Sequence, residues 1–121
     1  MPTASGHTTA IRASRVLGTD VKDSSGNVIG RIEDIVLDKV NNSIMFAVVG
    51  FGGVLGIGEK FHPLPWAALD YEPKKNAYIV PYTKDELDAA PNDTIAELTR
   101  DDGFAARDEA YDYYKIPPYW N

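Results

Sequence analysis

A glycine-rich stretch over Phe51–Trp66 contains residues spaced as in a phosphate-binding loop. Gly53 and Gly58 are separated like the glycines of the loop that cradles phosphates in many nucleotide hydrolases. In that loop a lysine follows the second glycine, whereas Glu59 stands at this place here. Because a carboxylate in that position repels phosphate, we do not expect the chain to bind nucleotides.

The same stretch has a second interpretation as a docking loop. Its four glycines allow the backbone to turn tightly between two strands. They either form a turn and nothing more, or they hold apolar side chains out for a protein partner, as exposed apolar patches often do. On the second interpretation, the predicted partner contacts in this stretch are Phe51, Val54, Leu55 and Ile57.

The remaining residues whose side chains could take part in catalysis or metal binding do not form a catalytic or metal-binding set. His62 is the only histidine inside the expected fold, and the chain has no cysteine. With so few nitrogen and sulfur ligands we expect no transition metal and no cofactor. We expect His62 to be a surface strand residue, with a catalytic or pH-sensing role as the alternative. Glu33 and Asp34 can act as acid and base, but their spacing does not distinguish them from other carboxylates.

Aromatic residues are concentrated at the C-terminal end. Tyrosine and tryptophan side chains bury large apolar areas and each carries one polar group. A tail that left them in water would therefore expose an unusually large apolar surface. Either the tail wraps back over its own domain or it crosses to another subunit. The residues are Tyr111, Tyr113, Tyr114, Tyr119 and Trp120, of which Tyr119 and Trp120 are predicted partner contacts.

The net charge of −6 lies in the C-terminal third of the chain. Residues 1–83 carry eight basic and eight acidic side chains, whereas residues 84–121 carry four and ten. Such a chain lacks the clustered cations that contact nucleic-acid phosphates or an anionic membrane. No apolar run approaches the roughly 18 residues of a transmembrane helix. The N-terminus also lacks the pattern of a signal peptide, so we expect a cytoplasmic protein.

The elements that must position these residues are mostly strands. Turn residues at 23–27 and 38–42 separate apolar runs. The alternation slips at Glu33–Asp34, which predicts a bulge there. Strands are expected over 16–22, 28–37, 43–51 and 59–64, followed by a helical turn at Trp66 and a hairpin over 70–81. We expect Trp66 to close one end of the barrel, with a role as a recognition aromatic as the alternative. Helices are expected from Thr83 to about Ala90, near Thr94, and over 103–114.

The strand over Ser43–Phe51 is apolar on both faces. A strand in a barrel shows only one face to the interior, so something must cover the other face. The sequence leaves two candidates open, the chain's own tail and a second subunit.

An ordered set of residues resembles the PRC-barrel family. That family is a small β-barrel named for the cytoplasmic domain of the photosynthetic reaction centre H subunit, and it also forms the C-terminal half of a ribosome-maturation factor. The resemblance covers about residues 16–82 and implies a non-catalytic barrel that docks onto a protein partner. The matching residues are Gly18, Val21, Asp23, Gly26, Ile29, Gly30, Ile32 and Asp34, followed by Gly52, Gly53, Leu55, Gly56, Pro65, Trp66 and Leu69.

We therefore predict a mainly β fold. A disordered lead-in over 1–12 precedes a small PRC-type β-barrel over 13–83 and an acidic extension with short helices over 84–121. The predicted function is non-catalytic protein interaction, by docking to a partner, by forming a homodimer, or both. One alternative is a ribosome- or RNA-associated factor with a stripe of Arg12, Arg15, Arg31 and Lys60. A less favoured alternative is a small acid/base enzyme built around His62 and Glu59.

Overall fold

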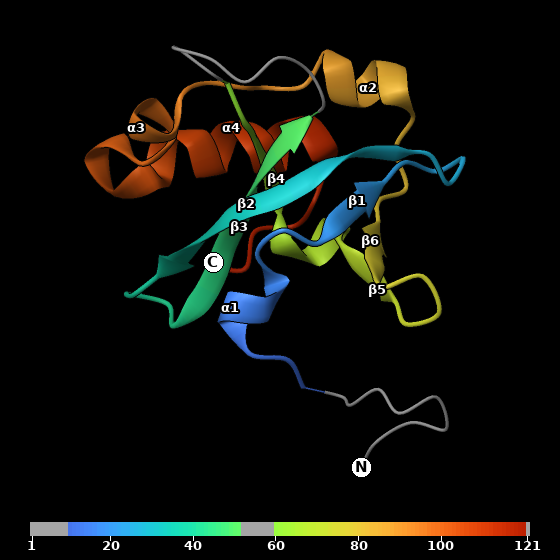
Figure 1. The fold of residues 1–121 in the computed structure, drawn as a ribbon. Coiled ribbons are helices and arrows are strands. Elements are labelled where there is room, and N and C mark those ends of the chain that lie inside the picture. The colour runs from blue at the N-terminus through green and yellow to red at the C-terminus, as the bar shows by residue number, and fades with distance from the viewer. Residues whose placement is uncertain (1–9, 52–59, 121) are drawn as a thin grey trace.

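The structure is a computed structural model that describes residues 10–51 and 60–120, with Phe51 described by its backbone alone. Six strands form one sheet, and helices gather around it (Figure 1). The elements in chain order are α1 (Ala13–Val16), β1 (Asp20–Lys22), β2 (Val28–Asp38), β3 (Ser43–Phe51), β4 (His62–Pro65), the 3-10 turn η1 (Trp66–Ala68), β5 (Asp70–Glu72), β6 (Ala77–Ile79), α2 (Lys84–Asp88), α3 (Ile95–Leu98), the 3-10 turn η2 (Arg100–Gly103) and α4 (Phe104–Tyr114).

The sheet has the strand order β4-β3-β2-β1-β6-β5, and β1 and β6 are its parallel neighbours. One core cluster contains Leu64 from β4, Val49 from β3 and Tyr78 from β6. Strands near opposite ends of the sheet therefore contribute to the same core, which requires the sheet to curl around it. This curl, with short helices in the C-terminal part, confirms the predicted fold class.

The hairpin of β2 and β3 contains the two longest strands of the sheet. Its register shifts between Ile32 and Asp34, which confirms the predicted bulge, and shifts again between Val36 and Leu37. The preceding turn is also as predicted: Gly26 has a φ of +87°, and the Asp23 carboxylate accepts the amides of two turn residues. Irregularities of this kind bend a small sheet toward closure.

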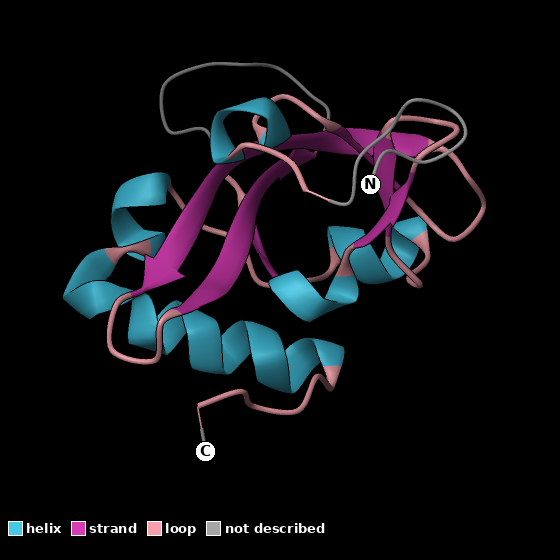
Figure 2. Cartoon of the chain, turned by 90° about the horizontal axis from the view of Figure 1, so that it is seen from below, coloured by secondary structure: helices cyan, strands magenta, loops and turns pink. Residues whose placement is uncertain are grey.

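The two apolar faces of β3 have separate covers. Ala47 and Val49 belong to the interior cluster, whereas Phe46 and Val48 pack in a second cluster with Leu98 of α3. Figure 2 shows the C-terminal helix and the final loop running beside the strands. The chain's own C-terminal extension therefore covers the outer face of β3, which answers the question that the sequence left open.

Local sequence signals explain where the helices of the extension begin. At the start of α2 the Thr83 hydroxyl accepts the Glu86 amide and the Glu86 carboxylate accepts the Thr83 amide, which is the predicted capping box. At the start of α3 the Thr94 hydroxyl accepts the Glu97 amide. Gly103 at the start of α4 has a φ of +77°, and a Cβ there would lie 3.3 Å from the sulfur of Met45.

Three sequence-based assignments need correction. The predicted strand over 16–22 is limited to β1, because Val16 closes α1 and a turn at Gly18, with a φ of +85°, interrupts the chain. The predicted strand over 59–64 is displaced to β4, while Phe61 forms an isolated bridge with Asp93. His62 was expected at the surface, but its side chain is buried. The lead-in over residues 1–9 lies outside the described residues.

If α3 covers β3, a cavity beneath α3 will destabilise the whole fold. We expect Leu98→Ala to lower the free energy of unfolding by about 2–5 kcal/mol, because it removes buried methyl groups and leaves a cavity. Ile95→Ala on the same helix is the control, since Ile95 is 38% exposed, and it should cost less than about 0.5 kcal/mol. Urea denaturation measures both values, and equal losses in the two variants would contradict the role of α3.

Candidate functional site

The first candidate site is the place where the C-terminal segment meets the β2–β3 turn. We call it the tail anchor, and it consists of Asp38, Arg107, Tyr111, Tyr119 and Trp120. The Tyr119 hydroxyl donates a 2.6 Å hydrogen bond to the Asp38 carboxylate. A guanidinium nitrogen of Arg107 lies 3.8 Å from the same carboxylate oxygen, and the side chains of both charged residues are largely buried.

Aromatic rings complete the tail anchor. The Arg107 guanidinium carbon lies 3.7 Å from the ring centroid of Trp120 and 4.7 Å from that of Phe104, which is a cation–π arrangement. The Tyr111 and Trp120 rings meet edge to face at 4.8 Å. The Tyr111 hydroxyl in turn donates a 2.8 Å hydrogen bond to the Met45 carbonyl. The tail is thus tied to both strands of the central hairpin.

Two turns bring these residues together. Asp38 ends β2, and one of its carboxylate oxygens accepts the amides of Val40 and Asn41 at 3.0 Å. This arrangement fixes the carboxylate while the chain turns into β3. At the end of α4, Lys115 takes the left-handed conformation with a φ of +57°, and the Ile116 amide bonds to the Tyr111 carbonyl at 3.1 Å. The chain then reverses, so the last residues return to the hairpin.

Hydrogen bonding lowers the pKa of one group of the tail anchor, and burial raises the pKa of two others. The hydrogen bond from Tyr119 is the main reason that the pKa of Asp38 falls from 3.8 to about 2, and donors from Asn41 act in the same direction. Burial opposes this shift but is weaker. Burial is the main reason that the pKa of Tyr119 rises above its ordinary value, and the Asp38 carboxylate adds to the rise. Burial also raises the pKa of Tyr111 to about 12.

His62 lies in the interior, whereas the sequence predicted a surface position for it. β4 pairs with the central strand β3 on one side, and His62 is opposite Val49 in that pairing. The side chain is 8% exposed, and burial lowers its pKa below 6.5, opposed by a hydrogen bond with the Pro91 backbone and by the charge of Asp88. The lowered pKa keeps the neutral imidazole as the stable form at neutral pH.

Of the six predicted partner contacts, only the side chains of Tyr119 and Trp120 are among the described residues. Tyr119 and Trp120 are half-buried and pack on their own chain in the tail anchor. The side chains of Phe51, Val54, Leu55 and Ile57 lie outside the described residues. Trp66 is half-buried, and its ring packs on Tyr78 at a centroid distance of 5.6 Å. The four basic residues of the proposed stripe, Arg12, Arg15, Arg31 and Lys60, are exposed.

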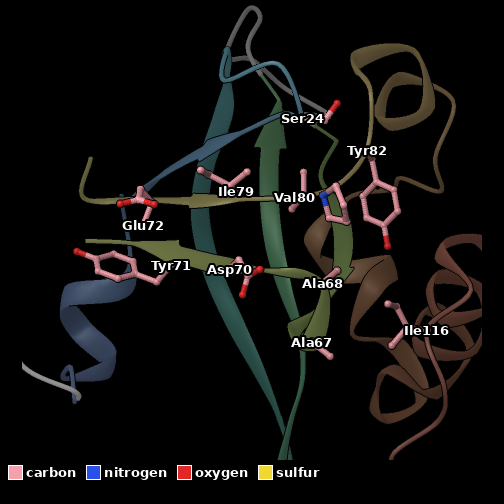
Figure 3. A pocket seen from close by; sticks show the side chains of 11 residues that line it. Ser24, Ala67, Ala68, Asp70, Tyr71, Glu72, Ile79, Val80, Tyr82 and Ile116 are labelled. Atoms are coloured by element: carbon pink, nitrogen blue, oxygen red, sulfur yellow. The ribbon is translucent and has the colours of Figure 1, made fainter. Parts of the chain in front are cut away.

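The second candidate site is an open groove of about 490 Å³ beside β5. Figure 3 shows Tyr71 and Glu72 toward one end of it, Asp70 and Val80 in the middle, and Tyr82 with Ile116 toward the other end. Its lining contains two carboxylates and no lysine or arginine. The sequence analysis missed this groove. The groove has one signal in the sequence, the acidic residues at alternate positions of a predicted strand. The sequence does not reveal that this strand lies at an edge of the sheet.

Comparison with known families shows which family the chain belongs to. The family model for the PRC-barrel domain matches residues 8–87, which is well over half of the chain. The chain belongs to the PRC-barrel domain family. A comparison with curated proteins gave no match. The matched part of this PRC-barrel protein runs from before α1 into α2, so the tail anchor joins Asp38 of the family domain to an extension that lies beyond it.

Two further findings concern the described part of the PRC-barrel protein. No helix in residues 10–51 and 60–120 is both long and apolar enough to cross a bilayer. Within the same residues, no three side chains of the metal-ligating types gather in one place.

The role of Tyr119 in the tail anchor can be tested by titration. We expect Tyr119→Phe to raise the pKa of Asp38 from about 2 toward 3.8, because the variant removes the strongest donor to the carboxylate. Tyr113→Phe is the matched control, since the Tyr113 hydroxyl donates instead to the exposed Glu86 carbonyl. NMR titration of the Asp38 carboxyl carbon measures the pKa. An unchanged pKa in Tyr119→Phe would contradict the assigned hydrogen bond.

The tail anchor also predicts how stability depends on acid. A carboxyl group with a pKa of 3.8 when unfolded and about 2 when folded stabilises the fold above about pH 4, and this contribution disappears as the pH falls toward 2. We therefore expect Asp38→Asn to be less stable than the wild type at pH 6. The difference between the two proteins should shrink between pH 4 and pH 2. Urea denaturation at several pH values tests this, and a constant difference would refute it.

Proposed function

We propose that this PRC-barrel protein is a non-catalytic docking module for another protein. The observation that carries the proposal is the open groove along β5, which is the last strand of the sheet order. A groove bordered by a strand with one unpaired edge fits an extended polypeptide, because main-chain groups at the edge can pair with it. The groove is open and partly apolar, as docking surfaces commonly are.

The arrangement of the polar residues supports the non-catalytic part of this proposal. Buried Asp38 accepts three hydrogen bonds from its neighbours Val40 and Asn41 and a fourth from Tyr119, and these bonds hold the β2–β3 turn and the tail in place. His62 is buried in the sheet beneath the extension. A general acid or base needs contact with a substrate, which neither position offers.

Docking to a different protein is favoured over a homodimer that exchanges its tails. The tail anchor already occupies Tyr119 and Trp120 within their own chain, and the outer face of β3 is already covered. A tail that crosses to a second subunit would first have to break these contacts. The residues Val54, Leu55 and Ile57, which follow β3 in the sequence, remain a second proposed contact region.

The proposal is tested by site-specific photo-cross-linking in the native cells. A photoreactive amino acid replaces Ala67, an exposed residue that lines the groove, and as a control it replaces Glu109, an exposed residue of α4. We expect the probe at Ala67 to capture a defined protein that the probe at Glu109 does not. The captured protein, once purified, should bind the wild-type chain in calorimetry.

Two results would contradict the docking function. Identical captured sets from both probes would show that the groove has no selective partner. Capture of the chain alone would replace docking by self-association. Repeating the experiment with Leu55→Asp shows whether the glycine-rich stretch contributes, because a charge in an apolar contact weakens binding.

A further inference from the structure

We propose that β5 pairs with an extended strand of the partner that carries lysine or arginine at alternate positions. This inference rests on the proposed docking function and names the chemistry of the docked segment. It follows from three features of the described residues: an available sheet edge, two carboxylates on that edge, and an apolar groove next to it.

The two edges of the sheet differ in their availability. β4 lies at one edge, but it contains Pro63 and Pro65, which have no amide to donate, and α4 packs against it. Next to β4, Phe61 is already bridged to Asp93. At the other edge, β5 pairs only with β6 among the described strands, and its residues Asp70 and Tyr71 are exposed. The edge that can accept a further strand is therefore β5.

The charges on β5 select a basic partner. Asp70 and Glu72 are two positions apart and so share one face of the strand. The Asp70 carboxylate has no hydrogen bond or ion pair within residues 10–51 and 60–120, and the Glu72 carboxylate accepts the Lys74 amide at 3.2 Å. Opposite charges on directly facing residues of neighbouring strands stabilise the pairing. A strand with cations two residues apart places one cation against each carboxylate.

The same charges disfavour a second copy of this chain on β5. Antiparallel pairing of two β5 strands about Tyr71 places Asp70 opposite the Glu72 of the second copy. Like charges in directly facing positions destabilise such a pair. Charged edge strands commonly prevent a sheet from joining to a copy of itself. The β5 edge thus favours a basic strand and disfavours a second copy of β5.

The residues between the cations of the docked strand should be apolar. They face the same side as Tyr71, whose ring packs edge to face on Tyr78 at a centroid distance of 5.1 Å. Ile79 is opposite Asp70 in the pairing of β5 with β6, so the part of the groove that it lines lies on the face of the carboxylates. An aliphatic side chain can pack on the Tyr71 ring while its neighbours reach the carboxylates on that other face. The preferred segment therefore alternates basic and apolar residues.

The test uses the full chain and a short fluorescein-labelled peptide of alternating lysine and valine. We expect fluorescence anisotropy to show saturable binding, and Asp70→Lys to weaken it about tenfold, because an attraction becomes a repulsion. Glu109→Lys changes the net charge by the same amount on exposed α4 and should leave the affinity within about twofold. Circular dichroism melting confirms that both variants are folded.

Strand addition is separated from simple charge attraction by hydrogen exchange. We expect the bound peptide to slow exchange of the backbone amides in β5, and a peptide with methylated amide nitrogens to lose this effect and its affinity. The proposal is overturned if a glutamate–valine peptide binds equally well, if Glu109→Lys weakens binding as much as Asp70→Lys, if β5 gains no protection, or if no peptide binds. If the peptide experiments fail but the probe at Ala67 still captures a partner, the docking function stands. The captured partner would then dock without a basic strand.

Discussion

The central strand β3 imposes the main physical constraint on this structure, because both of its faces must be removed from water. Its residues Met45–Val49 are almost completely buried. Curling the sheet covers one face with strands from both ends of the sheet order, but no arrangement of a single small sheet covers the other. The extension supplies the missing layer with Leu98 and Ala106, and the hydroxyl of Tyr111 satisfies the Met45 carbonyl within that layer. Residues beyond the matched family domain are therefore part of the core and not an appendage.

The tail anchor follows from the same requirement. A helix such as α4 contributes apolar contacts to β3, but its position along the strand is set by directional bonds, since apolar packing alone is not directional. Asp38 provides those bonds at the turn end of the hairpin. Its carboxylate organises the β2–β3 turn and also receives Tyr119, so one group links the turn to the end of the chain. Arg107 neutralises part of the buried charge while its flat face packs on Trp120, which explains how a cation is accepted in a cluster of aromatic rings.

Sequence reasoning succeeded where short-range signals determine the structure. The broken alternation at Glu33–Asp34, the capping residues Thr83 and Glu86, and the uniformly apolar β3 each produced the predicted local feature. It failed where long-range packing decides. Nothing near His62 indicates that α4 packs against its strand, and nothing near Asp38 distinguishes it from other acidic turn residues, because its partner Tyr119 is 81 positions away. The groove beside β5 was missed for the same reason, since strand order is a property of the whole sheet.

The two edges of the sheet show how packing in one region leaves another available. α4 and the Phe61–Asp93 bridge protect the β4 edge as a consequence of covering β3, whereas β5 pairs only with β6 among the described strands. On the proposed docking, Asp70 and Glu72 disfavour pairing of the exposed β5 edge with a second copy of β5. Repulsion between like carboxylates and attraction to cations are the same interaction with opposite signs. A strand protected from self-association by this means is for that reason selective for a basic partner, and its selectivity should decline as salt screens its exposed charges.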